Sequence, residues 1–232
     1  MTKTTMISNQ EGVTNRTFQS AIFDLDGTLI NSEPIYAKGW RYALKQYGYT
    51  ISNQTLERMT GQSIQTNNAL IGEIVGNEAL IPRVRQLRED YYDQALEQGE
   101  IQLLPGAQAF LQQLFDEGVT LAIASASKRT KVVKTLTVLE IKSFFTVVVA
   151  GDEVLTSKPD PAIYQQTLAK LHQTPATAIG FEDSLSGVLS CTRAGIPTVI
   201  MGERAQAIIP QLNQTEQSLI LGQYTDFTNL LS

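Results

Sequence analysis

The chain has 232 residues, of which 42% are hydrophobic and 18% charged, and its formal net charge is −5. This length and composition fit one large domain or a core with a small second domain, and they exclude a chain that is disordered throughout. The negative charge argues against a broad nucleic-acid-binding surface, and no hydrophobic run reaches the length of a membrane span. We therefore expect neither a nucleic-acid nor a membrane partner.

Cys191 is the single cysteine, which excludes an internal disulfide bond and a cysteine-based metal cluster. Its expected role is small apolar packing in a helix. Residues 1–18 lack the apolar segment of a secretory signal, and we expect them to form a flexible N-terminal extension. These features fit a reducing compartment, and we expect a cytoplasmic protein.

A short apolar run at residues 21–23 leads into the sequence DLDGTL at residues 24–29. An apolar run that ends at a turn is typical of a buried parallel strand. In extended backbone, a spacing of two places Asp24 and Asp26 on one face. Such a pair can hold a hard cation and divide the nucleophilic and acid/base roles. A lone Asp-x-Asp is more often only a polar turn, so the interpretation depends on the rest of the chain.

The next segment predicts helices. Ser32 can cap a helix that covers residues 35–47 and stops at Gly48. From there to about Gly99, apolar residues recur at steps of three and four, and no segment alternates with a period of two. We predict an all-helical module of three to five helices. The aromatic residues of its first helix are expected to serve packing: Tyr36, Trp40, Tyr42 and Tyr47.

After the helical module, strand patterns alternate with helix patterns. The expected strands are residues 119–124, 145–150, 177–181 and 197–201, with an edge strand at 218–221. The alternation implies right-handed βαβ units and a parallel sheet. The predicted fold class is α/β: a Rossmann-like parallel-sheet core, residues 19–34 and 101–232, with an inserted all-helical domain, residues 35–100.

Four segments at or beyond the ends of core strands carry polar residues that suit one site. The carboxyl ends of parallel strands share one edge of a sheet, so residues far apart in the sequence can meet there. Each residue alone would more often be a helix cap, a helix N-terminal charge or a solvated surface group. Together, in this order, they predict a common site: Asp24 and Asp26, Ser125, Lys158, and Glu182 with Asp183.

The four motifs resemble those of the haloacid dehalogenase-like hydrolase superfamily, and within it the group of β-phosphoglucomutases and sugar-phosphate phosphatases. The matching segments are residues 24–29, 124–128, 157–161 and 180–184 with Gly187, and the similarity extends from about residue 19 to 202. The resemblance implies a small-molecule phosphate ester as the partner. It also implies that the helical insert is a cap that closes over the site and contacts the substrate. We expect a monomer.

The resemblance assigns a role to each matching residue. Asp24 is the expected nucleophile, which forms an aspartyl-phosphate, and Asp26 the expected general acid and base. Ser125 and the backbone amide of Ala126 are expected to hold phosphate oxygens. Lys158 is expected to neutralise the nucleophile and the transferring phosphoryl group.

The resemblance also implies a Mg²⁺ ion. Its expected ligands are Asp24, Asp183 and the backbone carbonyl of Asp26, with Glu182 assisting through water. Oxygen ligands with room for water and phosphate are those that Mg²⁺ prefers. The cation would reduce the repulsion between a carboxylate nucleophile and a phosphate dianion.

The predicted cap departs from the mutase pattern. A His is expected in the first cap helix of the mutases and an Arg on a cap loop, where Tyr36 and Ile64 stand in this chain. A later basic residue is kept as Arg88, so Tyr36 and Arg88 are the expected substrate contacts in the cap. A mutase must hold a second phosphate, and the loss of a bidentate Arg weakens that ability.

We therefore predict a Mg²⁺-dependent phosphatase that hydrolyses a small phosphorylated metabolite, a sugar or polyol phosphate. A phosphosugar mutase of the β-phosphoglucomutase type is the alternative, and a non-catalytic sensor of a phosphorylated ligand is the third hypothesis. The motifs do not identify the substrate.

Overall fold

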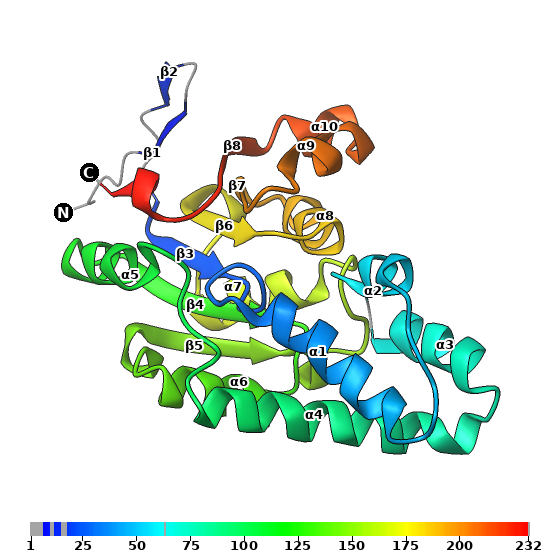
Figure 1. The fold of residues 1–232 in the computed structure, drawn as a ribbon. Coiled ribbons are helices and arrows are strands. Elements are labelled where there is room, and N and C mark those ends of the chain that lie inside the picture. Colours follow the sequence, from blue (N-terminus) through cyan, green and yellow to red (C-terminus); the bar gives the residue numbers. More distant parts are fainter. Residues whose placement is uncertain (1–6, 10–11, 15–17, 63, 232) are drawn as a thin grey trace. The chain divides into compact units, whose positions relative to one another are not determined.

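The computed structural model describes residues 7–9, 12–14, 18–62 and 64–231. The chain forms two compact units: residues 31–102 make one, and the chain before and after them makes the other. The first unit is helical, whereas the second contains a large sheet (Figure 1). The predicted fold class, α/β with an inserted all-helical domain, is confirmed.

The larger unit is built on a six-stranded sheet with the strand order β5-β4-β3-β6-β7-β8. All neighbouring strands in it are parallel. Because β3 lies between β4 and β6, the residues that follow it lie at the middle of the carboxyl edge. The strands are β3 (Ser20–Phe23), β4 (Thr120–Ser125), β5 (Phe145–Ala150), β6 (Ala178–Glu182), β7 (Thr198–Met201) and β8 (Ile220–Tyr224).

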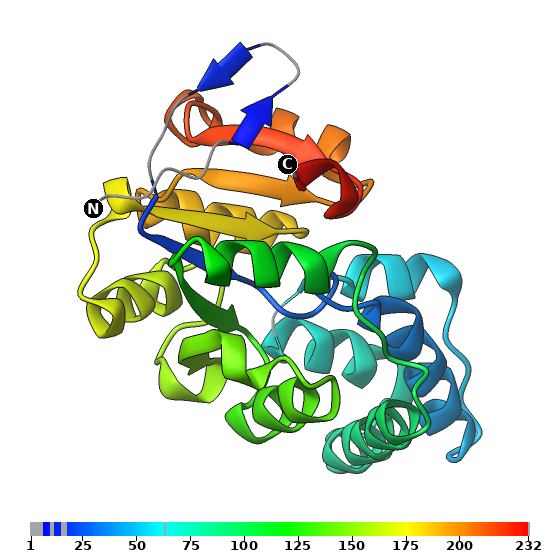
Figure 2. The ribbon, with the colours of Figure 1, turned by 90° about the vertical axis from the view of Figure 1, so that its left-hand side faces the viewer.

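Helices cover both faces of this sheet, and Figure 2 shows α5 on the near face and α8 on the far one. Helices lie on both faces because the crossovers between parallel strands are right-handed. The chain first runs from β3 through β4 to the edge strand β5, and it then returns past β3 to β6 in the opposite direction, which places the later helices on the opposite face. The helices of this unit are α5 (Ala107–Asp116), α6 (Arg129–Val138), α7 (Ala162–Leu171), α8 (Leu185–Arg193), α9 (Ala205–Ile208) and α10 (Gln214–Gln217).

Strand β3 sends alternate side chains into two separate cores. Phe23 lies on the α5 face, with its ring centroid 6.4 Å from that of Phe110 in an edge-on arrangement. Ile22 belongs to the cluster on the opposite face, which includes Tyr164 of α7. Since side chains alternate along a strand, Asp24 continues the row of Ile22 and lies on the α7 side.

The smaller unit contains four α-helices among its described residues. Its core is formed by residues from all four, with Trp40, Leu70 and Val84 among the buried side chains. The prediction of an all-helical insert therefore holds for the part of it that the structure describes. The helices are α1 (Ser32–Lys45), α2 (Asn53–Met59), α3 (Ile64–Val75) and α4 (Ile81–Glu97).

The start of α1 differs from the sequence-based expectation. Ser32 is the first residue of the helix rather than its cap, and its buried hydroxyl has no hydrogen-bond partner in the part of the chain that the structure describes. The cap position is Asn31, whose side chain accepts a hydrogen bond from the backbone of Gln102 at 2.7 Å instead of capping the helix. The backbone N–H of Asn31 also donates to the carbonyl of Gln102. These bonds join the two ends of the helical unit.

The N-terminal segment contains regular structure. Strands β1 (Ile7–Asn9) and β2 (Gly12–Thr14) pair antiparallel. Of the predicted flexible extension, residues 1–18, the structure describes only these two strands and residue 18; residues 1–6, 10–11 and 15–17 lie outside the described residues. Across the described chain, every helix is too short or too polar to cross a bilayer.

Cys191 packs against the sheet as a small apolar group. It lies on α8 without exposed surface, and a Cβ added to Gly180 of β6 would be only 2.2 Å from its Sγ. Burial raises the pKa of the Cys191 thiol to about 12, so the thiol is neutral at pH 7. Gly180 is therefore the residue that allows α8 to approach β6 at this point.

This contact yields a stability prediction. Gly180→Ala should lower the free energy of unfolding by about 1–3 kcal/mol, because its methyl group overlaps a buried sulfur in a close-packed core. Cys191→Ala in the same chain removes the sulfur and should recover most of that loss. Urea unfolding of the two single variants and the double variant measures both effects. An equal loss with and without Cys191 would contradict this contact.

Candidate active site

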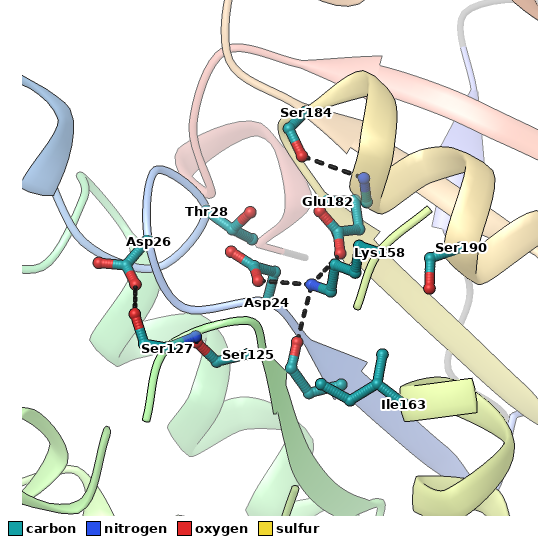
Figure 3. Close-up of polar contacts among 12 residues, drawn as sticks. Asp24, Asp26, Thr28, Ser125, Ser127, Lys158, Ile163, Glu182, Ser184 and Ser190 are labelled. Atoms are coloured by element: carbon teal, nitrogen blue, oxygen red, sulfur yellow. Dashed lines mark hydrogen bonds and ion pairs between the residues drawn. The ribbon is translucent and has the colours of Figure 1, made fainter. Parts of the chain in front are cut away.

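The candidate site lies where β3, β4 and β6 end, at the carboxyl edge of the sheet (Figure 3). Asp24 follows β3, Ser125 ends β4, and Glu182 ends β6. Lys158 comes from the segment between β5 and α7. Parallel pairing thus brings together side chains that are up to 158 residues apart in the sequence, as between Asp24 and Glu182.

Lys158 is the centre of this arrangement. Its Nζ donates to Asp24 Oδ1 at 2.6 Å, to Glu182 Oε1 at 2.5 Å and to the backbone carbonyl of Ala124 at 2.9 Å. An ammonium group has three N–H donors, so these acceptors use all of them. Its side chain is only 5% exposed, which fixes the position of the charge beside Asp24.

The charged groups around Lys158 shift one another's pKa values. Burial raises the pKa of Asp24 well above its usual range; Lys158 opposes this shift, and the carboxylates of Glu182 and Asp183 add to it. Burial also disfavours the charge on Lys158, but the two carboxylates that it contacts outweigh this effect and raise its pKa. Lys158 is therefore positively charged at neutral pH.

The site gathers three buried carboxylates that a cation would fit. Asp24, Glu182 and Asp183 are buried, and each offers a carboxylate oxygen within 4.8 Å of the others. The ammonium group of Lys158 pairs with Asp24 and Glu182, and Glu182 Oε2 has no hydrogen-bond partner within the described structure. Carboxylate oxygens suit a hard divalent ion. The triad can therefore hold a metal ion, whereas Asp26 remains a predicted ligand through its backbone.

Gly27 brings the first loop against Asp183. A Cβ at Gly27 would lie 2.3 Å from Asp183 Oδ2, and its φ of 83° is in the left-handed region that favours glycine. The next residue, Thr28, donates from Oγ1 to Asp183 Oδ1 at 3.2 Å. The DLDGT segment thus positions the carboxylate of Asp183, which comes from another loop, as well as its own two aspartates.

The second loop contacts Asp26 rather than Asp24. Ser125 is 1% exposed, and its Oγ accepts a hydrogen bond from the backbone N–H of Ser127 at 3.1 Å. The hydroxyl of Ser127 donates to Asp26 Oδ2 at 2.8 Å. The two acids of the first motif therefore have different polar partners. Ser127 was not among the predicted site residues, although it lies within the second motif.

Tyr164 is a second residue that sequence reasoning missed. It is fully buried on α7, and its hydroxyl donates to Glu182 Oε1 at 2.6 Å. The sequence shows only a tyrosine in the helix after Lys158. A buried tyrosine hydroxyl needs a hydrogen-bond partner, but the sequence does not identify which residue is that partner.

The predicted cap residues form a cluster within the helical unit. The guanidinium carbon of Arg88 lies 4.8 Å from the ring centroid of Tyr36 and 4.9 Å from that of Trp40. Arg88 is 7% exposed and pairs with Glu89 at 2.9 Å. Tyr36 also stacks on Tyr92, with centroids 5.3 Å apart. These aromatic rings therefore pack within the unit and hold a buried guanidinium group.

A sequence profile of haloacid dehalogenase-like hydrolases matches residues 21–201, which contain all four motifs. The chain therefore belongs to this family, as the motifs predicted, and it is an enzyme of the phosphatase type within it.

Named relatives and a solved structure agree with this family. The chain is 28% identical over 208 residues to a phosphorylated carbohydrates phosphatase of Thermotoga maritima, covering 88% of this chain and 91% of the relative. It is 30% identical over 190 residues to a phosphoglycolate phosphatase of Yersinia pestis, covering 79% and 81%. A HAD hydrolase of family IA, variant 3, from Entamoeba histolytica shares the fold, with a TM-score of 0.79, 23% identity and coverage of 93% and 96%.

The close approach of Gly27 to Asp183 leads to a binding prediction. If Asp183 is a ligand as predicted, Gly27→Ala should weaken Mg²⁺ binding at least about tenfold, because the added methyl group displaces this carboxylate. Isothermal titration of the purified protein with Mg²⁺ measures the affinity.

Gly202→Ala is the matched control for this prediction. Gly202 has a φ of 80° but nothing lies within 4 Å of an added Cβ, so the variant carries similar backbone strain without touching the acids. Equal Mg²⁺ affinities for the two variants would contradict the assignment of Asp183 to the cation site.

Proposed function

We propose that the protein hydrolyses a small phosphorylated metabolite, a sugar or polyol phosphate, through an aspartyl-phosphate on Asp24. The observation that carries this proposal is the Lys158 ammonium group, held 2.6 Å from Asp24 within a buried acidic cluster. A fixed positive charge beside a carboxylate suits the transfer of an anionic phosphoryl group. The family and its named phosphatases support the same reaction class.

The proposed reaction has two displacement steps. In the first, a carboxylate oxygen of Asp24 bonds to phosphorus while the bond from phosphorus to the substrate oxygen breaks, and Asp26 gives that oxygen a proton. In the second, Asp26 takes a proton from water, and the water oxygen displaces Asp24 from phosphorus. Inorganic phosphate leaves, and both aspartates return to their starting states. Lys158 offsets negative charge throughout, and Ser125 with the amide of Ala126 holds phosphate oxygens.

We propose that Asp24 and Asp183, with the backbone of Asp26 and the assistance of Glu182, hold Mg²⁺. When bound, the ion supplies positive charge that offsets the repulsion between the nucleophile and the phosphate. The three buried carboxylates of Asp24, Glu182 and Asp183, whose oxygens lie within 4.8 Å of one another, support this assignment. Thr28 and Gly27 keep Asp183 near Asp24.

We propose that Tyr36 and Arg88 contact the part of the substrate beyond the phosphate. Arg88 Nε and Arg85 Nη1 are buried and have no hydrogen-bond partner among the described residues, so the helical unit holds guanidinium donors that a polar ligand could satisfy. The relative from Thermotoga maritima is named for phosphorylated carbohydrates, which are rich in hydrogen-bond acceptors. This similarity favours sugar and polyol phosphates over other monoesters.

A phosphate-release assay tests the function. The enzyme with Mg²⁺ should release phosphate from members of a panel of sugar, polyol and nucleotide monophosphates. Glucose 1-phosphate with a trace of glucose 1,6-bisphosphate belongs in the panel. Formation of glucose 6-phosphate with little free phosphate would identify a mutase instead and reject the proposed hydrolysis.

The nucleophile is tested by Asp24→Asn. This variant should lose more than about a thousandfold in kcat, because an amide oxygen is a poor nucleophile toward phosphorus. Its circular dichroism and urea midpoint report whether the fold persists. Substantial residual turnover in a folded Asp24→Asn protein would remove Asp24 from this role.

The acid/base role is tested by Asp26→Ala across leaving groups. We expect kcat to fall about 10²- to 10⁴-fold for an alkyl phosphate, whose alkoxide needs a proton to depart. For p-nitrophenyl phosphate, the loss in the first step should be smaller, because nitrophenolate leaves without protonation. Single-turnover release of nitrophenolate isolates that step. An equal loss for both substrates would argue against Asp26 as the general acid.

A further inference from the structure

Two donors share a single oxygen of Glu182. Lys158 Nζ donates to Oε1 at 2.5 Å, and the hydroxyl of Tyr164 donates to the same atom at 2.6 Å. Glu182 and Tyr164 have no exposed surface, so water does not compete for these bonds. The Lys158 Nζ also lies 5.3 Å from the centroid of the Tyr164 ring, which adds a cation–π contact.

The other side of the Glu182 carboxylate is closed by the first turns of α8. A Cβ at Gly187 would lie 1.8 Å from Glu182 Oε2, so this carboxylate is pressed against glycine backbone. Among the described residues, Oε2 has no hydrogen-bond partner. The orientation of the carboxylate in the protein therefore depends on the two donors at Oε1.

We propose that Tyr164 is a positioning residue for the proposed phosphoryl transfer: by holding Glu182 from α7, it sets the place of the Lys158 ammonium group beside Asp24. This inference rests on the proposed function, because Lys158 acts on the transferring phosphoryl group there. Tyr164 itself touches none of the reacting atoms. It acts through one shared oxygen.

The physical basis is competition for charge. With Tyr164 present, its neutral hydroxyl supplies one of the hydrogen bonds that the buried Glu182 carboxylate needs. Lys158 can then bond to Asp24 and Glu182 together. Without that hydroxyl, Lys158 would be the only donor to Glu182 among the residues that the structure describes. The ammonium group is then drawn toward Glu182 and away from Asp24, which reduces its effect on the charge that develops during transfer.

Tyr164→Phe tests this role, since it removes one oxygen and keeps the ring. We expect kcat to fall on the order of tenfold with little change in KM, as for the loss of a buried hydrogen bond to a charged group. The matched control is Thr167→Val, which removes a buried hydroxyl from the same helix; that hydroxyl donates to the carbonyl of Ile163 at 2.7 Å. The control should keep its kcat.

A second measurement does not depend on turnover. The free energies of unfolding of Tyr164→Phe, Glu182→Met and the double variant form a cycle that reports the coupling of the two side chains. We expect the loss from Tyr164→Phe to shrink or disappear when Glu182 is already replaced. Additive losses would reject the shared hydrogen bond as the source of any effect on kcat.

The two measurements separate the possible failures. An unchanged kcat in Tyr164→Phe, or an equal loss in Thr167→Val, rejects the positioning role while the proposed function stands. The unfolding cycle could show coupling between Tyr164 and Glu182 while the unaltered enzyme hydrolyses no phosphate ester. In that case the proposed function is wrong, and the role of Tyr164 in phosphoryl transfer is rejected with it. A selective loss of kcat together with coupling supports the inference.

Discussion

The site depends on the buried ion pairs of Lys158. Removing one charge from such a group leaves its partner unpaired in a poorly solvated place, so the members stabilise one another as a set. Three strands end beside this ammonium group: Asp24 beyond β3, the Ala124 carbonyl in β4, and Glu182 in β6. The arrangement is held by parallel strand pairing, because that pairing brings the three strand ends to one edge.

Because side chains alternate along β3 and β6, the aromatic core residues lie on one face of the sheet and the acidic site residues on the other. Phe23 and Phe181 face α5 and stack on each other, with centroids 4.6 Å apart. Asp24 and Glu182, each one residue further on, face α7, where Lys158 and Tyr164 contact them. A shift of one residue in either strand would exchange an acid for an aromatic ring. The aromatic core therefore helps to keep the acids in position.

The helical insert combines packing with unused donors. Arg88 lies between the rings of Tyr36 and Trp40, and its Nε has no hydrogen-bond partner in the described structure. Aromatic contacts stabilise the buried guanidinium group without using its N–H donors. The sheet unit, in turn, holds the groups proposed for phosphoryl transfer.

The α/β class with an all-helical insert, and the motif residues near the carboxyl edge, could be predicted from the sequence, because hydrophobic period and parallel topology are local or general rules. The sequence did not determine that Tyr164 bonds to Glu182, that Ser127 bonds to Asp26, or that Asn31 bonds to Gln102 rather than capping α1. These contacts join residues between 18 and 101 positions apart. The fold sets these contacts, because the packing of whole elements, and not the local sequence, determines which polar partner lies within about 3 Å of a side chain.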